Sequence, residues 1–77
     1  MAISAYIFIE CSLGKARDVA REIGKIPGVK QAHAVTGAYD VIAFVEASDI
    51  NVLGDFIISR VHALSGVFRT TTNVVVD

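Results

Sequence analysis

The sequence predicts an α+β domain in which two β-α-β halves build one antiparallel sheet. Three observations predict it. Two segments carry apolar side chains on both alternating faces, two others carry them at helical spacing, and one motif recurs 38 positions along the chain, Ile26-Pro27-Gly28-Val29 returning as Leu64-Ser65-Gly66-Val67. With 77 residues in all, we expect residues 1–77 to form a single domain.

The first half is a strand followed by a helix. The strand is expected over Ala2 to Glu10, where isoleucines and alanines lie on one face and Tyr6 and Phe8 on the other. Apolar side chains on both faces are typical of a central strand that is covered on both sides. The segment from Lys15 to Ile26 then changes to helical spacing, and Pro27-Gly28 ends that helix.

A hairpin is expected next. Val29 to Thr36 is a more polar strand, Gly37-Ala38-Tyr39 is a tight turn, and Asp40 to Glu46 is a second strand with two apolar faces. The short connection predicts that these two strands pair with each other.

The second half continues with a helix and a final strand. Ser48 or Asp49 can cap the helix, and Gly54 in its middle suggests close packing. Ser65-Gly66 ends it, and Val67 to Val76 is the last strand, which is polar in its middle. The expected buried stripe of the helix is Ile50, Leu53, Ile57, Val61 and Leu64.

Right-handed connections arrange these strands in the order 4-1-3-2, the ferredoxin-like βαββαβ arrangement. The two strands that are apolar on both faces then fall in the centre, and the two polar strands fall at the edges. Both helices must cover the same face, so the opposite face is left apolar and bare. A bare apolar sheet face marks an interaction surface, and we expect a homodimer that forms sheet against sheet.

Charge and residue usage exclude several classes of function. Seven Lys and Arg stand against eight Asp and Glu, and no basic stripe is visible, so we expect no direct binding of nucleic acid. The uncharged opening from Met1 to Ile9 is about half a membrane span and follows no basic segment, which predicts a cytoplasmic protein without membrane contact. Cys11, His33 and His62 show no catalytic or metal-ligand spacing, and we expect no catalytic residue, no metal and no cofactor.

Three motifs together resemble a known family. The hairpin reads Val35-Thr36-Gly37-Ala38-Tyr39-Asp40, the helices end in I-P-G-V and L-S-G-V, and the last strand reads Val67-Phe68-Arg69-Thr70-Thr71-Thr72. On a βαββαβ frame, these motifs resemble the effector-binding (RAM) domain of the Lrp/AsnC transcription regulators over nearly the whole chain. Family regulators carry a helix-turn-helix before this domain, whereas the first expected strand here begins at residue 2, so we expect a stand-alone form of the domain.

The resemblance implies a function as well as a fold. It implies homodimers that assemble further into rings of dimers, an amino-acid effector bound between dimers, and modulation of transcription. One route to that modulation is co-assembly with full-length Lrp/AsnC regulators.

An amino-acid effector needs donors for its carboxylate and an acceptor for its ammonium group. Gly37 lets a ligand approach the backbone N–H groups of the hairpin, Asp40 can pair with the ammonium, and Tyr39 can form a wall and offer its hydroxyl. The candidate effector-binding residues are therefore Thr36, Gly37, Ala38, Tyr39, Asp40, Thr70 and Thr72.

Each candidate also has a structural explanation: turn geometry for Gly37, a local hydrogen bond for Asp40, interface packing for Tyr39 and edge-strand composition for the threonines. In the expected strand order, the hairpin and the last strand lie at opposite edges. If both contact one ligand, the site must therefore lie between chains.

Two other functions remain open. One is a small dimeric ferredoxin-like enzyme, such as a cofactor-independent monooxygenase or a haem-pathway decarboxylase subunit, with a pocket inside its helix–sheet layer lined by His, Asn or Trp. The sequence contains no Trp, which disfavours this alternative. The other is a purely structural partner that sets the oligomeric state of a regulator and binds no ligand.

Overall fold

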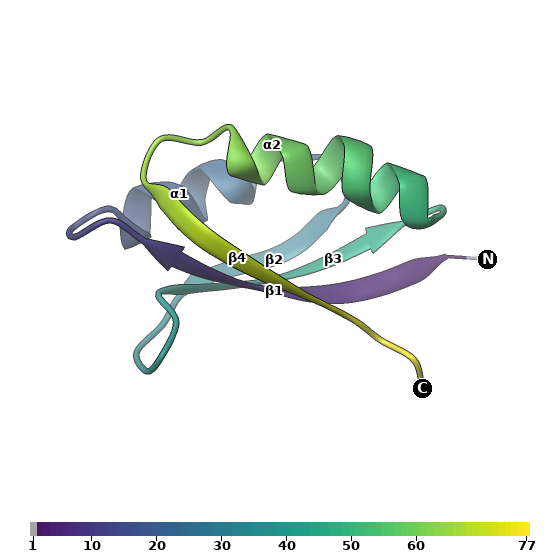
Figure 1. Cartoon of the computed structure of the whole chain (residues 1–77), viewed down its shortest axis with the longest axis horizontal. Helices are drawn as coiled ribbons and strands as arrows, with labels where there is room; N and C mark the ends of the chain where they lie inside the picture. Colours follow the sequence, from purple (N-terminus) through teal and green to yellow (C-terminus); the bar gives the residue numbers. More distant parts are fainter. Residues whose placement is uncertain (1) are drawn as a thin grey trace.

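The computed structural model describes residues 2–77 and has two layers, a sheet and the helices above it (Figure 1). The sheet has four strands in the order β2-β3-β1-β4, and every neighbouring pair is antiparallel. This confirms the predicted ferredoxin-like fold and strand order. The elements are β1 (Ile3–Cys11), α1 (Ala16–Ile23), β2 (Val29–Ala34), β3 (Val41–Ala47), η1 (Val52–Ile58), α2 (Ser59–His62) and β4 (Val67–Val74).

The core lies between the sheet and the helices. Alternate residues of β1 and β3, such as Ile7 and Val45, face the helices and are fully buried, because consecutive strand residues point to opposite faces. Val19 and Ile23 of α1 and Leu53 of η1 pack onto them. Every buried residue among those described is apolar.

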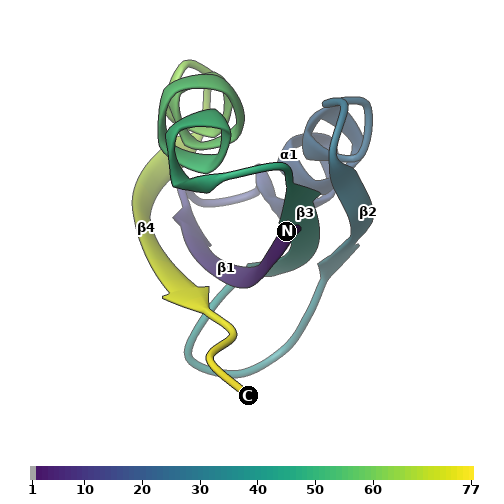
Figure 2. The ribbon, with the colours of Figure 1, turned by 90° about the vertical axis from the view of Figure 1, so that its right-hand side faces the viewer.

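The opposite face of the sheet has no helix over it, as Figure 2 shows from the end of the sheet. Its centre consists of Tyr6, Phe8, Ile42 and Phe44, which we call the open face. The rings of Tyr6 and Phe44 lie 4.9 Å apart between centroids, and Tyr6 is 46% exposed. The predicted second apolar face of the central strands is therefore present.

The second helix differs from the expectation. Asp49 caps it, its Oδ1 accepting a hydrogen bond of 2.9 Å from the backbone N–H of Val52, but η1 is a π-helical stretch that runs into α2. Ile50 was expected in the buried stripe, but it is 56% exposed. The residues of this helix that are buried are Leu53, Ile57 and Val61, which recur every four positions, and Ile50 lies outside that spacing. Close packing at Gly54 was also a wrong expectation, since an added Cβ there would meet nothing within 4 Å.

The internal repeat has a structural counterpart. Gly28 and Gly66 both adopt φ of +97°, a conformation that residues with a Cβ rarely take. Each lies where the chain turns from a helix into an edge strand. The carbonyl of Gly28 accepts from the N–H of Glu46 in β3, and that of Gly66 from the N–H of Ser12, the residue after β1, both at 2.8 Å.

Candidate functional site

The connection between β2 and β3 is longer than the sequence indicated. Residues 35–40 lie outside the strands, where a three-residue turn was expected. One backbone bond, from the Val35 N–H to the Asp40 carbonyl at 2.9 Å, closes this loop. Thr36, Gly37 and Ala38 are exposed at its tip, and Gly37 has φ of +118°. The loop bends away from the helices toward the open-face side (Figures 1 and 2).

Asp40, at the end of this loop, is attached to the neighbouring strand β1. Its backbone N–H donates to the Ile9 carbonyl at 3.0 Å, and its carboxylate Oδ2 accepts from the Cys11 N–H at 2.7 Å. These bonds hold Asp40 against the end of β1, just beyond the irregular pairing between Glu10 and Cys11. One oxygen of the carboxylate is therefore already engaged in the fold.

The same contact affects the cysteine. Cys11 is half-buried, and burial raises the pKa of its thiol above the ordinary value of 9.0, with the nearby charge of Asp40 adding to the effect. The thiol therefore stays protonated at neutral pH.

Tyr39 lies across the open face. Its ring packs on Phe8 with centroids 4.9 Å apart and an interplanar angle of 44°. It is half-buried, so the loop extends the aromatic surface formed by Tyr6, Phe8 and Phe44.

Thr70 and Thr72 lie on the other side of the sheet from the hairpin tip. Thr70 is opposite Ile9 and Thr72 is opposite Ile7, whose side chains face the helices, and directly opposite residues share a face. Both threonines are half-buried. Both side chains therefore lie on one common side of β4.

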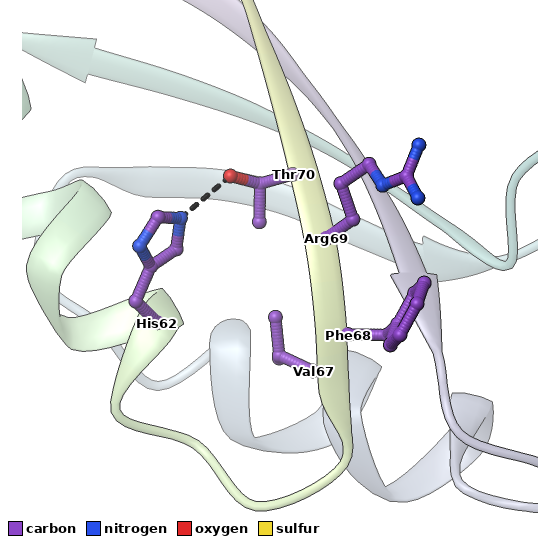
Figure 3. A pocket seen from close by; sticks show the side chains of 5 residues that line it. All are labelled: His62, Val67, Phe68, Arg69 and Thr70. Carbon is purple, nitrogen blue, oxygen red and sulfur yellow. Dashed lines mark hydrogen bonds between the residues drawn. The ribbon is translucent and has the colours of Figure 1, made fainter.

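A pocket of about 370 Å³ lies beside Thr70, where α2 ends and β4 begins (Figure 3). His62, Val67 and Thr70 lie on one side of β4 and Phe68 and Arg69 on the other. His62 Nε2 and Thr70 Oγ1 are 2.6 Å apart. His62 was not among the residues predicted from the sequence, because its partner lies across a turn and the periodicity of the helix does not reveal that contact.

The hairpin candidates and the threonines do not surround one cavity within the chain. Ile9 pairs with Val41 on one side and Thr70 on the other, so β1 separates the two groups. The hairpin bends toward the open face, whereas Thr70 contacts α2. A ligand that touched both groups would need parts of two chains, as the strand order predicted.

A second hollow of about 320 Å³ lies between α1 and the turn after α2. Val19 and Leu64 form its apolar part, and Lys15, Asp18 and Glu22 stand at its rim. Asp18 already pairs with Arg21 of the same helix at 3.3 Å, and Glu22 with Lys25, just after the helix ends, at 3.0 Å. No group of three His, Cys, Asp or Glu within residues 2–77 is placed to hold a metal ion.

The model of the Lrp/AsnC ligand binding domain matches residues 4–77. The chain belongs to the Lrp/AsnC family. Its relatives include an uncharacterised HTH-type transcriptional regulator of Pyrococcus abyssi, which is 38% identical over 61 residues, or 79% of this chain and 41% of the regulator. They also include a homocitrate synthase of Sulfurisphaera tokodaii, 38% identical over 74 residues, or 95% of this chain and 16% of that enzyme. The chain thus spans less than half the length of these curated relatives.

Solved structures have the same fold. A protein of Thermus thermophilus superposes with a TM-score of 0.90 at 29% identity, covering 97% of this Lrp/AsnC domain and 94% of that chain. A transcriptional regulator of Neisseria meningitidis, solved as a complex with L-Met, superposes with a TM-score of 0.83 at 23% identity, covering 97% of this chain and 50% of that one. The second likeness concerns the fold alone.

Proposed function

We propose that this Lrp/AsnC domain is a non-enzymatic module that binds an amino acid and assembles through its open face to modulate transcription in the cytoplasm. The observation that carries the proposal is the open face itself. Tyr6, Phe8, Ile42 and Phe44 lie together on a sheet surface over which no described helix passes. Contiguous apolar surface on a small protein marks a binding site, and a second copy presents the matching surface in a two-fold dimer.

The relatives support a binding role over a catalytic one. The same domain matches part of a transcriptional regulator and part of a homocitrate synthase. The occurrence of one unit in two proteins with such different activities supports a role that both can use, such as the binding of a small molecule. The regulator from Neisseria meningitidis was solved with L-Met, which makes an amino acid the first ligand class to test.

The lining of the layer between helices and sheet supports a binding module over the enzyme alternative. That alternative requires a pocket in this layer lined by polar side chains. Among the described residues, the layer is filled by aliphatic side chains and contains no buried polar group. Both hollows lie at the surface, next to the turn after α2.

The effector is best placed between copies of the chain. Thr36, Gly37 and Ala38 are exposed on the open-face side, and Thr70 lies on the helix side. Because one chain does not bring these groups together, a ligand that uses both joins two chains and shifts the population of assemblies by mass action.

Thermal denaturation with each of the twenty amino acids tests the effector function. At a ligand concentration of about 100 Kd, binding stabilises the fold by about 2.7 kcal/mol, which raises Tm on the order of 10 °C for a domain of this size. We expect one or a few amino acids to raise Tm and to change the sedimentation coefficient. If no amino acid does either, the chain is a structural partner instead.

Sedimentation also tests the open face. Phe44→Glu places a charge at its centre, and we expect this variant to sediment as a monomer because burying an unpaired carboxylate opposes dimer formation. The matched control is Val52→Glu, which adds the same charge at a surface residue of η1 that is 36% exposed. A wild-type chain that is monomeric at micromolar concentration would refute this assembly.

A further inference from the structure

The polar side chains that line the pocket at the start of β4 are all hydrogen-bond donors. Its polar side chains are those of His62, Arg69 and Thr70, all of which can donate hydrogen bonds, and none of its lining residues is acidic. We propose that this pocket binds a carboxylate group and that His62 is the positioning residue for Thr70 within it. This inference rests on the proposed effector function, for which it names the end of the ligand that this part of the chain holds.

His62 can orient the Thr70 hydroxyl. The contact of 2.6 Å between His62 Nε2 and Thr70 Oγ1 joins two residues from different elements across the pocket (Figure 3). A hydroxyl has one proton and two lone pairs. When His62 donates its Nε2 proton to Oγ1, the Thr70 proton is free to point into the pocket, where an anionic oxygen can accept it.

The backbone of β4 adds a donor at the same place. The Val75 N–H donates to the Ser4 carbonyl at 2.8 Å, and bonding partners alternate along an antiparallel ladder. By this alternation, Thr71 and Asn73 direct their backbone groups toward β1. Thr70 therefore directs its N–H toward the outer edge of the sheet, where β4 has no neighbouring strand.

Arg69 supplies positive charge beside these donors. Its guanidinium is loosely held, 3.8 Å from Glu10 and 5.4 Å from the centroid of the Phe68 ring, and the side chain is 64% exposed. It lies on the other side of β4 from His62, so it strengthens the local potential and is free to move toward a bound anion (Figure 3).

An amino acid also carries an ammonium group, and the pocket has no acceptor side chain of opposite charge for it. Asp40 lies on the far side of β1 from Thr70, with Oδ2 engaged by Cys11. The pocket therefore holds the carboxylate end, and the acceptor for the ammonium end comes from a second copy of the chain.

Two small molecules of similar size test the carboxylate end and the ammonium end of an amino acid separately. We would titrate the ¹⁵N-labelled chain with isovalerate, which has the carboxylate alone, and with isopentylamine, which has the ammonium alone. We expect isovalerate to shift the amide signals of residues 67–70 and the ring signals of His62, and isopentylamine to leave them in place. Equal effects of both probes, or no effect of isovalerate at tens of millimolar, would overturn the proposal.

Variants then test the role of His62. Thr70→Val should weaken isovalerate binding about tenfold to a hundredfold, the effect of losing one hydrogen bond to a charged group. His62→Leu should weaken it in the same direction, because the Thr70 hydroxyl is then no longer oriented. His62→Gln, whose amide can still donate to Thr70, should restore most of it, which a merely structural role would not predict. The controls are His33→Leu and Thr71→Val, at exposed positions on the other face of the sheet, and unchanged binding in His62→Leu would overturn the role of His62.

Thermal denaturation with the twenty amino acids distinguishes a failure of this inference from a failure of the proposed function. If an amino acid stabilises wild type and His62→Leu equally, the pocket is wrong and the effector function stands. If isovalerate shifts residues 67–70 while no amino acid changes stability or assembly, the pocket stands and the effector function is wrong.

Discussion

Gly28→Ala places a methyl group where the fold has no room for it. Gly28 has φ of +97°, and an added Cβ would lie 2.9 Å from the Glu46 carbonyl oxygen and 2.8 Å from Ile57 Cδ1. The carbonyl cannot retreat easily, because it belongs to central strand β3 and the same residue donates its N–H to Gly28 at 2.8 Å.

The magnitude follows from two contributions. A left-handed backbone conformation costs a residue with a Cβ about 1–2 kcal/mol, and forcing a methyl group into packed surroundings costs about 1–3 kcal/mol more. Gly28→Ala should therefore lower the free energy of unfolding by about 2–5 kcal/mol. A chain of this length has only about 4–12 kcal/mol in total, so the variant should lose a large share of its stability.

Gly37→Ala is the matched control. Gly37 also has positive φ, at +118°, but an added Cβ there meets nothing within 4 Å, so only the backbone contribution applies. Urea denaturation followed by circular dichroism measures both variants against wild type, and an unchanged slope with urea shows that the comparison is valid. Equal loss of stability in the two variants would refute the argument from the Glu46 carbonyl.

Three further predictions use the same urea assay. Gly54→Ala should raise the free energy of unfolding by up to about 1 kcal/mol, because the position is helical, open and free of positive φ; a loss would indicate that the π-helical stretch needs glycine. Asp40→Ala should lower it by about 2 kcal/mol through loss of the charge-assisted bond to Cys11, and an unchanged midpoint would contradict this. Burial and Asp40 raise the thiol pKa of Cys11, so the folded chain holds this proton more tightly than the unfolded chain; the contribution of this thiol to stability should fall as the pH rises above 9.0, and Cys11→Ala should remove that part of the fall.

The Asp40→Ala result also limits how effector binding can be tested. A loss of ligand response in that variant would be ambiguous, because Asp40 holds the loop to β1 through two bonds. His62→Leu and Thr70→Val are cleaner tests, since His62 is exposed and Thr70 lies on an edge strand.

The strand order and the two faces of the sheet could be predicted from local patterns. Residues on one face of a strand recur every second position, so apolar side chains at both Ile7 and Phe8 already indicate a strand that needs cover on two sides. The recurring Gly28 and Gly66 marked where each helix turns into an edge strand, because positive φ is a local property that selects glycine. The apolar faces of a strand and the positive φ of a turn depend on residues that are adjacent in the chain, so the sequence shows them directly.

The tertiary structure alone decided the details of the loop and the pocket. Asp40 bonds to Cys11, 29 positions away, and this bond fixes the end of the hairpin loop to β1. His62 of α2 contacts Thr70 of β4 because the two elements pack side by side after the turn, and the residue pattern within either element does not reveal this contact. Residue patterns thus determined which faces are apolar and where the chain turns, whereas the contacts that give a polar side chain its role depend on how the completed elements pack together.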